Sequence, residues 1–563
     1  MSGDDLGLLT DASVLPIPAQ MFTLPVELQT LITNFLDCTD ICNLRLSCRA
    51  AALGTADIFG RRYFKKRQFF IGEASLEALV GIASTPHLAR RLTHLIIGLE
   101  SFPRTMYDRY DDRLRYPDEA AAYNAFARGA VGQLALVSSG GARDLIELAL
   151  SKLLSLARIE LRDYDAPMRD GKSFQCWSSW GATTSRSVCS QPLHSAKPLY
   201  DYHASTNWAS TVTQLVLAAL GRSGNKAVRT IEINTRNKHF NISSAALVMP
   251  RTLERCVDSV LARLTTVKLN VEVTPPGPSI VAAGQGAERK TYIWEIANFL
   301  SKLQSLRHLR LNLKRDYWPN PILPERDLLI WLADAESDMG RPPVATTILG
   351  DSSSSRLRNL PRFDRPLESL ELGRIGIPAK IVVALVNRFR KSLKHLALHR
   401  VTLLPPEDSP GRWNRNAGKF VNILDRLLKQ LALFEDLDLQ SVALSNITQH
   451  VFDGSNWEYT HTPFLKPSAV SDVVQPTTER TYRGDEWRTW ADEISQGMVK
   501  FWPRDGFRFR EDEDEDVNQV GSEEEDEEEG AEEEEEEGAG DEEEEGAGAE
   551  NEEVDDDQVM AGI

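Results

Sequence analysis

The sequence has no run of about 18 apolar residues, the length that a membrane-spanning helix needs. Its first residues, Met1 to Leu6, lack the basic region and the apolar stretch of a secretion signal. Only 6 of its 563 residues are cysteine, too few for a disulfide framework in so long a chain. We therefore expect a protein of a reducing compartment, the cytoplasm or the nucleus, without a membrane segment.

Sequence motifs of catalysis are missing as well. There is no G-x-S-x-G, no G-x-x-x-x-G-K-[ST], no H-E-x-x-H and no kinase set. Cys38, Cys42 and Cys48 lie close together, but their spacing suits no common zinc pattern, so we expect small buried apolar residues there. His395 and His399 are four residues apart, a spacing that brings two ligands together on a helix but not on the strand expected here. We expect no enzyme, no metal and no cofactor, although a Cys–His pair that meets only in space stays open.

Positive charge is absent from one end of the chain. Residues 511–563 hold 30 Asp and Glu and no Lys or Arg, so the other residues hold 83 − 30 = 53 acids against 64 bases. Self-repulsion and the lack of apolar residues predict a disordered acidic tail behind a mildly basic body. Such a tail either keeps the protein soluble or attracts basic proteins, and it argues against binding of nucleic acid.

The segment 21–70 is rich in apolar residues with helical spacing. Pro25 and Glu27 mark the start of a helix, and Leu28, Leu31 and Ile32 begin a stripe along one face. Two shorter helices follow, over 41–48 and 50–59. Three helices in about forty residues bury too little surface to be stable alone. The stripe therefore packs either on the following domain, as a helical cap, or on a partner chain.

These residues resemble an F-box. The matching motif is Leu24-Pro25-Val26-Glu27-Leu28, followed by Ile32, Leu36, Asp40-Ile41, Leu44, Leu46, Cys48-Arg49 and Leu53. Ala50-Ala51 departs from the pattern, since many members carry a basic or aromatic residue there. The resemblance implies that a Skp-type adaptor, and through it a cullin ligase, binds this segment. The contacts that it implies are Leu24, Pro25, Leu28, Ile32 and Leu36.

A six-residue frame, L-x-x-L-x-L, recurs eight times through the middle of the chain. Its last positions alternate apolar and polar residues, as a half-buried strand does, and helical patterns precede several copies. Helix-then-strand units predict parallel strands with helices on one face. The copies begin at Leu92, Leu156, Val228, Leu264, Leu306, Leu367, Leu393 and Phe434.

This pattern resembles leucine-rich repeats of irregular period, although the Asn or Cys that regular repeats place after the strand is missing. The resemblance implies a solenoid whose exposed strand face reads a protein client. The alternative is that exposed strand positions are simply polar. The candidate client-binding residues are His94, Arg158, Lys268, His308, Arg310, Glu371 and His395.

Long polar insertions and an aromatic segment complete the chain. Insertions are expected near 164–208, 275–286 and 341–356. The aromatic residues within 456–510 predict a cap over the open end of the solenoid, or else a client pocket.

The expected class is therefore α/β. We expect a flexible N-terminus 1–20, a three-helix F-box 21–70, an irregular leucine-rich-repeat-like solenoid 71–455, a cap 456–510 and a disordered acidic tail 511–563. The expected function is that of a substrate-recognition adaptor of a cullin-type ubiquitin ligase, whose client the sequence does not identify. The alternative is a non-catalytic scaffold or chaperone that binds basic proteins through the tail.

Overall fold

The computed structural model is a mixed α/β protein whose main sheet is mostly parallel and has thirteen strands among the described residues. The predicted terminal segments 1–20 and 511–563 and the insertion 341–356 lie outside these residues, as does the insertion 275–286 except for its last two residues. The described residues are 24–102, 117–164, 166–167, 176–177, 179–182, 202–236, 241–272, 285–314, 324–333, 360–404, 422–452, 457–461 and 479–498.

The strands of the main sheet follow one another in chain order. The path is β1-β2-β3-β6-β8-β9-β10-β11-β12-β15, and every neighbouring pair on it is parallel except β12 and β15. The strands on this path are β1 (Lys66–Phe70), β2 (His94–Gly98), β3 (Arg158–Arg162), β6 (Thr230–Asn234), β8 (Thr266–Glu272), β9 (His308–Lys314), β10 (Ser369–Pro378), β11 (His395–Leu404), β12 (Ser441–Ser445) and β15 (Glu479–Arg483).

Short strands extend this path at three places. β7 (Ile242–Ser243) pairs with β8, β13 (Thr448–Phe452) pairs with β11, and β14 (Trp457–His461) pairs with β13. A separate two-stranded sheet joins β4 (Ala166–Pro167) to β5 (Cys176–Trp177).

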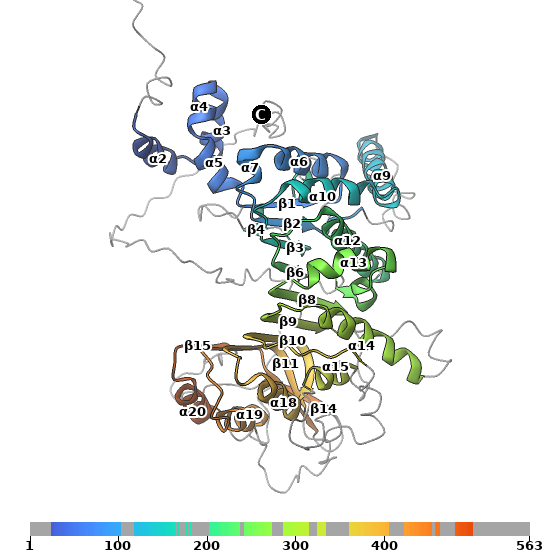
Figure 1. Ribbon diagram of the computed structural model, residues 1–563, viewed down its shortest axis with the longest axis vertical. Helices are drawn as coiled ribbons and strands as arrows, with labels where there is room; N and C mark the ends of the chain where they lie inside the picture. The colour runs from blue at the N-terminus through green and yellow to red at the C-terminus, as the bar shows by residue number, and fades with distance from the viewer. Residues whose placement is uncertain are drawn as a thin grey trace, which may run out of the picture. The chain divides into compact units, whose positions relative to one another are not determined.

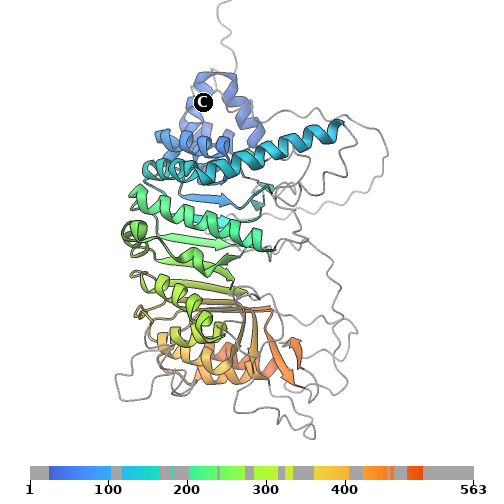
Figure 2. The same ribbon diagram turned by 90° about the vertical axis from the view of Figure 1, so that its right-hand side faces the viewer.

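Helices connect the parallel strands and lie in a row against one face of the sheet (Figures 1 and 2). Neighbours in this row contact one another, from α6 through α10 and α12 to α13, and from α14 through α15, α18 and α19 to α20. The helices of the row are α6 (Glu73–Ser84), α10 (Gly141–Lys152), α12 (Tyr202–Ser223), α13 (Arg251–Leu261), α14 (Gln285–Ser301), α15 (Pro324–Ala333), α18 (Ala379–Phe389), α19 (Ile423–Ala432) and α20 (Trp487–Gly497).

Three further helical segments accompany this row. α7 (Pro86–Ala89) lies just before β2, α9 (Pro117–Ser138) contacts α6 and α10, and a 3₁₀-helix (Ser244–Leu247) contacts α12 and α14. No helix in the described part of the chain is long and apolar enough to cross a membrane.

The apolar positions of the six-residue frame form the core between the sheet and the helices. In the frame of β2, Leu92, Leu95 and Ile97 are 0, 1 and 0% exposed, and the same three positions are buried in the frames of β3, β6, β8, β9, β10 and β11. The first seven predicted frames are therefore confirmed as strands. The third, fifth and seventh frame positions point to the opposite side, which we call the open face of the sheet.

The eighth frame is displaced by five residues from its predicted place. The strand is not at Leu437–Leu439 but at β12, where His395 of β11 pairs with Ser441. The frame that matches its neighbours is therefore Leu439-x-x-Val442-x-Leu444, and all three residues are at most 2% exposed. Both six-residue windows satisfy the pattern, and only the pairing with β11 selects the second.

The eight frames predict neither β1 nor the strands β4, β5, β7, β13, β14 and β15. β1 lies inside the segment assigned to the helices, and Lys66 of β1 pairs with His94 of β2. Its frame carries Arg67 where the other parallel strands carry a leucine, isoleucine or valine. The guanidinium carbon of Arg67 lies 5.0 Å from the ring centre of Phe64 and 5.4 Å from that of Trp180, and burial lowers the Arg67 pKa to about 10. An arginine held between two rings thus replaces the apolar side chain.

Part of the first long insertion returns to the free edge of β1. The backbone N–H of Trp180 donates to the carbonyl of Gln68 at 2.9 Å, and Trp180 makes a parallel bridge with Phe69. Ala182 packs with Phe70 beside Phe102. This segment occupies hydrogen-bonding groups that an edge strand otherwise leaves open to other chains.

The N-terminal segment has four helices instead of the three expected. They are α2 (Val26–Asn34), α3 (Cys38–Ser47), α4 (Arg49–Gly54) and α5 (Ala56–Tyr63). The third predicted helix divides after Gly54, a residue of low helix propensity, and the buried Thr55 hydroxyl donates to the carbonyl of Ala51 at 2.7 Å. Asp37 caps α3 by accepting a hydrogen bond from the Asp40 backbone.

The described part of the aromatic C-terminal segment lies against the last parallel strand and the last helices. β15 pairs with the outer edge of β12, and α20 packs on α19. Trp487 is 1% exposed, and its Nε1 donates to the carbonyl of Leu437 at 3.2 Å. This is the arrangement expected of a segment that covers the end of a row of strands.

Candidate functional site

The apolar stripe of α2 faces away from the rest of the N-terminal helices. Leu28, Leu31, Ile32 and Phe35 occur at i, i+3, i+4 and i+7, and their exposed fractions are 46, 54, 38 and 82%. Thr33 of α2 is fully buried instead, and its hydroxyl donates to the carbonyl of Gln29 at 2.7 Å. An amphipathic helix normally buries its apolar side, so this orientation leaves a surface suited to a partner.

Two more exposed leucines belong to the same helical segment. Leu46 on α3 is 54% exposed and Leu53 on α4 is 68% exposed. We call the six residues the N-terminal apolar surface: Leu28, Leu31, Ile32, Phe35, Leu46 and Leu53.

The five predicted adaptor contacts fall partly on this surface. Pro25, Leu28 and Ile32 are exposed, whereas Leu24 and Leu36 are half-buried. Leu24 and Leu36 also hold the ends of α2 in place. The side chain of Gln29 donates to the Leu24 carbonyl at 2.7 Å, and Arg62 donates to the Leu36 carbonyl at 2.8 Å.

The open face of the sheet carries the predicted client-binding residues in two register columns. His94, Arg158, His308 and His395 occupy the third frame position, the column that also contains Ser369. Lys268, Arg310 and Glu371 occupy the fifth, and each is paired in register with the next. Pairing of neighbouring strands therefore brings together residues that lie far apart in the sequence.

His94 differs from the other six because it is buried, with only 9% exposed, and it is not available to a client. Its Nε2 lies 2.9 Å from Oε2 of Glu160, which is 3% exposed. Burial lowers the pKa of His94 despite this contact. Burial also acts to raise the pKa of Glu160, but His94, Arg162 and Asn234 outweigh it and lower the pKa to about 2. The pair is a structural contact between β2 and β3.

The remaining charges of the open face partly neutralise one another across strands. Arg158 forms an ion pair with Glu232, which also lies 3.6 Å from the Nζ of Lys268. Nε of Arg310 lies 3.7 Å from Oε2 of Glu371. These side chains are half-buried, except for the buried Glu232, so the candidate residues form a mixed-charge surface rather than a uniformly basic one.

The two remaining histidines of the third column are half-buried. Nδ1 of His395 lies 3.2 Å from the hydroxyl of Ser441 on the next strand. Burial lowers the pKa of His395, and the nearby His308 and Lys394 add to that effect, against Glu368 and Glu371. At neutral pH the His395 side chain is therefore uncharged.

Sequence reasoning missed the seventh frame position of the open face. The amide of Asn312 donates to Oδ1 of Asn270 at 2.7 Å, and the amide of Asn270 donates to the carbonyl of Thr235 at 3.0 Å. Next to Asn312, β10 carries Gly373, where a Cβ atom would lie 2.0 Å from Oδ1 of Asn312. The shared seventh frame position indicates from the sequence that Asn270, Asn312 and Gly373 are neighbours. It does not show that the two asparagines form a hydrogen bond.

The three N-terminal cysteines are partly exposed rather than buried as expected. Cys48 caps α4, since its sulfur accepts the backbone N–H of Ala51 at 3.4 Å. Cys38 and Cys42 lie near the guanidinium of Arg67, whose charge they act to stabilise. Among the described residues, no three His, Cys, Asp or Glu side chains gather as a metal site would require.

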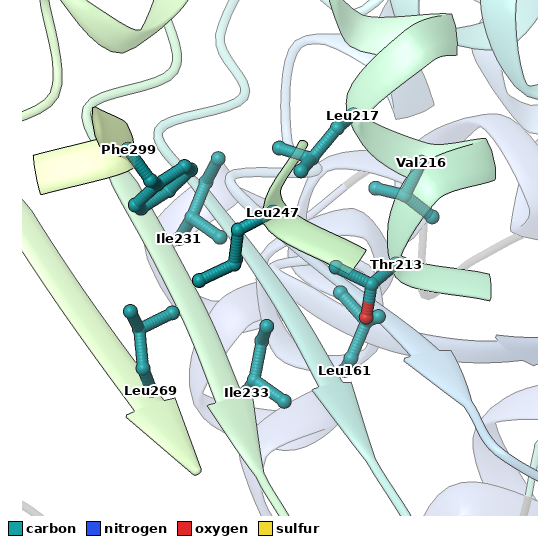
Figure 3. A pocket seen from close by; sticks show the side chains of 9 residues that line it. All are labelled: Leu161, Thr213, Val216, Leu217, Ile231, Ile233, Leu247, Leu269 and Phe299. Carbon is teal, nitrogen blue, oxygen red and sulfur yellow. The ribbon is translucent and has the colours of Figure 1, made fainter. Parts of the chain in front are cut away.

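A small apolar cavity lies between α12 and the strands β3, β6 and β8 (Figure 3). Its volume is about 10 Å³, space for about one water molecule at most. The lining is apolar except for Thr213, whose hydroxyl is bound to the carbonyl of Ala209 at 2.8 Å. This cavity is a packing defect of the core and is too small to bind a ligand. The side chains that line it are Leu161, Thr213, Val216, Leu217, Ile231, Ile233, Leu247, Leu269 and Phe299.

The chain matches no protein-family model and no curated protein. The N-terminal apolar surface and the open face of the sheet are therefore the two candidate functional sites of the described residues.

Proposed function

We propose that the protein is a substrate-recognition adaptor of a cullin-type ubiquitin ligase in the cytoplasm or nucleus. Its helices α2 to α5 act as an F-box that binds a Skp-type adaptor, and its strands and helices act as an irregular leucine-rich-repeat solenoid that holds a protein client on the open face. It performs no catalysis of its own. Its contribution is proximity, because a bound client has a high effective concentration near the ubiquitin that is transferred.

The observation that carries this proposal is the exposure of the α2 stripe. If these helices were an ordinary cap on the following domain, Leu28, Ile32 and Phe35 would be packed against it. Their exposure supports the other interpretation, in which a second chain covers them. About 25 cal/mol is gained for each Å² of apolar surface removed from water, so covering several large side chains gives such a partner a strong driving force.

Co-purification with a Skp-type adaptor tests the proposal. The double variant Leu28→Asp/Phe35→Asp places two charges on the N-terminal apolar surface and is expected to abolish adaptor binding. Since both side chains are exposed, the fold should be retained, as measured by circular dichroism and thermal unfolding. A matched control is Leu148→Asp/Leu154→Asp, because these leucines are also exposed but lie on α10 and just after it, outside α2 to α5. Wild-type binding by the first variant would refute the F-box proposal.

A second candidate function rests on composition. The 30 acidic residues of 511–563 are suited to holding basic proteins by charge attraction, without any role in ubiquitin transfer. Deletion of 511–563 separates the two proposals. The scaffold proposal predicts loss of client binding on deletion and a strong dependence on salt. The solenoid proposal predicts that client binding is retained.

A further inference from the structure

Three residues that directly follow the seventh frame position of β10, β11 and β12 share an unusual backbone conformation. Arg374, Arg400 and Asn446 have φ angles of 53°, 52° and 50°, and they are the non-glycine residues with positive φ in the described ranges. Arg374 and Arg400 are aligned, because the residues on either side of them are paired between β10 and β11. Asn446 is aligned with Arg400, because β12 and β13 pair with β11 before and after it. The conformation thus repeats across three adjacent strands at one level.

This conformation is unfavourable for arginine. A left-handed residue with a Cβ atom costs roughly 1–2 kcal/mol, which glycine avoids and asparagine partly offsets. Asn446 follows that preference, whereas Arg374 and Arg400 do not. Strained residues of this kind are concentrated where a side chain has a role other than stability.

Among the residues that the structure describes, neither of the two arginines has a hydrogen-bond acceptor or an ion-pair partner for its guanidinium, although Arg310 beside them contacts Glu371. Burial lowers the pKa of Arg374, and repulsion by Arg400 and Arg310 adds to this effect, against attraction by Asp163. Three like charges therefore lie close enough to repel one another, an arrangement that an anion would stabilise.

We propose that Arg374 and Arg400, with Arg310 beside them, bind a run of carboxylates on an acidic polypeptide. Neighbouring strands are about 4.8 Å apart, and each guanidinium offers a fork of donors that matches a carboxylate. An extended acidic segment that crosses β10 and β11 carries a carboxylate about every 3.3 Å along its backbone, so the flexible side chains of nearby acidic residues can reach both guanidinium groups. The acidic polypeptide is the kind of client that the open face would hold in the proposed function, so this inference rests on that function.

An acidic polypeptide fits this surface better than a nucleic acid does. Carboxylates lie close to the basic group, with Glu371 beside Arg310, Asp163 near Arg374, and Glu479 near His399. They confine the positive charge to a few strands. The regularly spaced phosphates of a nucleic acid would lie against these carboxylates and be repelled by them. A short acidic segment can reach the arginines without contacting the carboxylates.

Fluorescence anisotropy with the full-length chain tests the proposal. The probe is a fluorescein-labelled peptide of six glutamates, compared with a peptide of six glutamines. The double variant Arg374→Gly/Arg400→Gly is expected to weaken binding by about tenfold or more for each arginine. Its thermal midpoint should stay the same or rise, because glycine relieves the left-handed conformation. The charge-matched control Arg251→Gln/Arg255→Gln, on the exposed side of α13, should bind like wild type.

Several results would overturn the proposal. These are equal binding of both peptides, wild-type binding by the double glycine variant, and no measurable binding of the glutamate peptide. Tighter binding of a six-nucleotide oligothymidylate would indicate a nucleic-acid site instead. Adaptor co-purification with the same proteins keeps the two proposals apart, because the glycine variant should still bind the adaptor, whereas Leu28→Asp/Phe35→Asp should still bind the peptide.

Discussion

The guanidinium carbon of Arg45 on α3 lies 4.2 Å from the ring centre of Phe59 on α5. Nη1 of the same arginine donates to the carbonyl of Ala52 at 2.8 Å and to the hydroxyl of Thr55 at 3.2 Å. One side chain therefore joins α3 to α4 and α5. It fixes the helices that display the N-terminal apolar surface without being part of that surface.

Arg45→Ala is expected to loosen these helices. The cation–π contact and the charged hydrogen bonds together contribute about 2 kcal/mol. Hydrogen–deuterium exchange should show faster exchange over 38–63 and little change in the main sheet. Arg61→Ala is the control, since Arg61 forms an exposed ion pair with Asp57, and its effect should stay within about 0.5 kcal/mol. Equal exchange in both variants would contradict the role assigned to Arg45.

Glu160 should make the fold sensitive to acid. Its pKa is about 2 in the folded chain instead of 4.5, because the contacts with His94, Arg162 and Asn234 outweigh the effect of burial. A depressed pKa stabilises the folded state above pH 4.5, and this contribution is lost as the pH falls from about 4.5 to 2. Glu160→Gln should therefore lower the free energy of unfolding at pH 7 by on the order of 3 kcal/mol and flatten its pH dependence below pH 4.5.

Glu295 provides a control of opposite sign. Burial raises its pKa, although the hydroxyl of Ser244 donates to it at 2.6 Å. The ionised Glu295 side chain therefore destabilises the folded state above its unfolded pKa. Glu295→Gln should raise the free energy of unfolding at pH 7, measured by urea titration. A loss of stability in the Glu295 variant as large as in the Glu160 variant would contradict both assignments.

Gly98 lies at the end of β2 against two buried side chains. A Cβ atom there would lie 1.9 Å from Oε2 of Glu100 and 2.3 Å from the hydroxyl of Ser179. Gly98→Ala should therefore cost about 1–3 kcal/mol of stability through overpacking. Gly81→Ala is the counterpart, since nothing lies within 4 Å of a Cβ atom at that position of α6. It should stabilise the protein by up to about 1 kcal/mol, and thermal unfolding should show opposite shifts of the midpoint.

Trp487 ties the last helix to the end of the sheet. Trp487→Phe removes the bond to the Leu437 carbonyl and should cost about 1 kcal/mol, whereas Trp487→Ala should cost about 3–5 kcal/mol. Denaturant titration measures both variants. Trp294→Phe changes an exposed tryptophan of α14 and should be nearly neutral. A small effect of Trp487→Ala would mean that α20 is dispensable for the stability of the sheet.

The helix-and-strand order was largely predictable from local pattern. Leu306, Leu309 and Leu311 have the spacing of a buried strand, and α14 before them has the pattern of a helix. The prediction failed where the local pattern was ambiguous or broken. Leu439 belongs to two windows that satisfy the same frame, and Arg67 occupies an apolar position because Phe64 and Trp180 enclose it.

The sequence by itself determined which residues are apolar, how they repeat, and therefore that helices alternate with strands of a mostly parallel sheet. Only the tertiary structure decided that Leu28 and Phe35 are exposed, that His94 is buried, and that Arg374 lies beside Arg400 with the same positive φ. The physical reason is the sequence separation over which each property is determined. Periodicity is a property of neighbouring residues, whereas burial, charge pairing and register depend on which distant segments pack together.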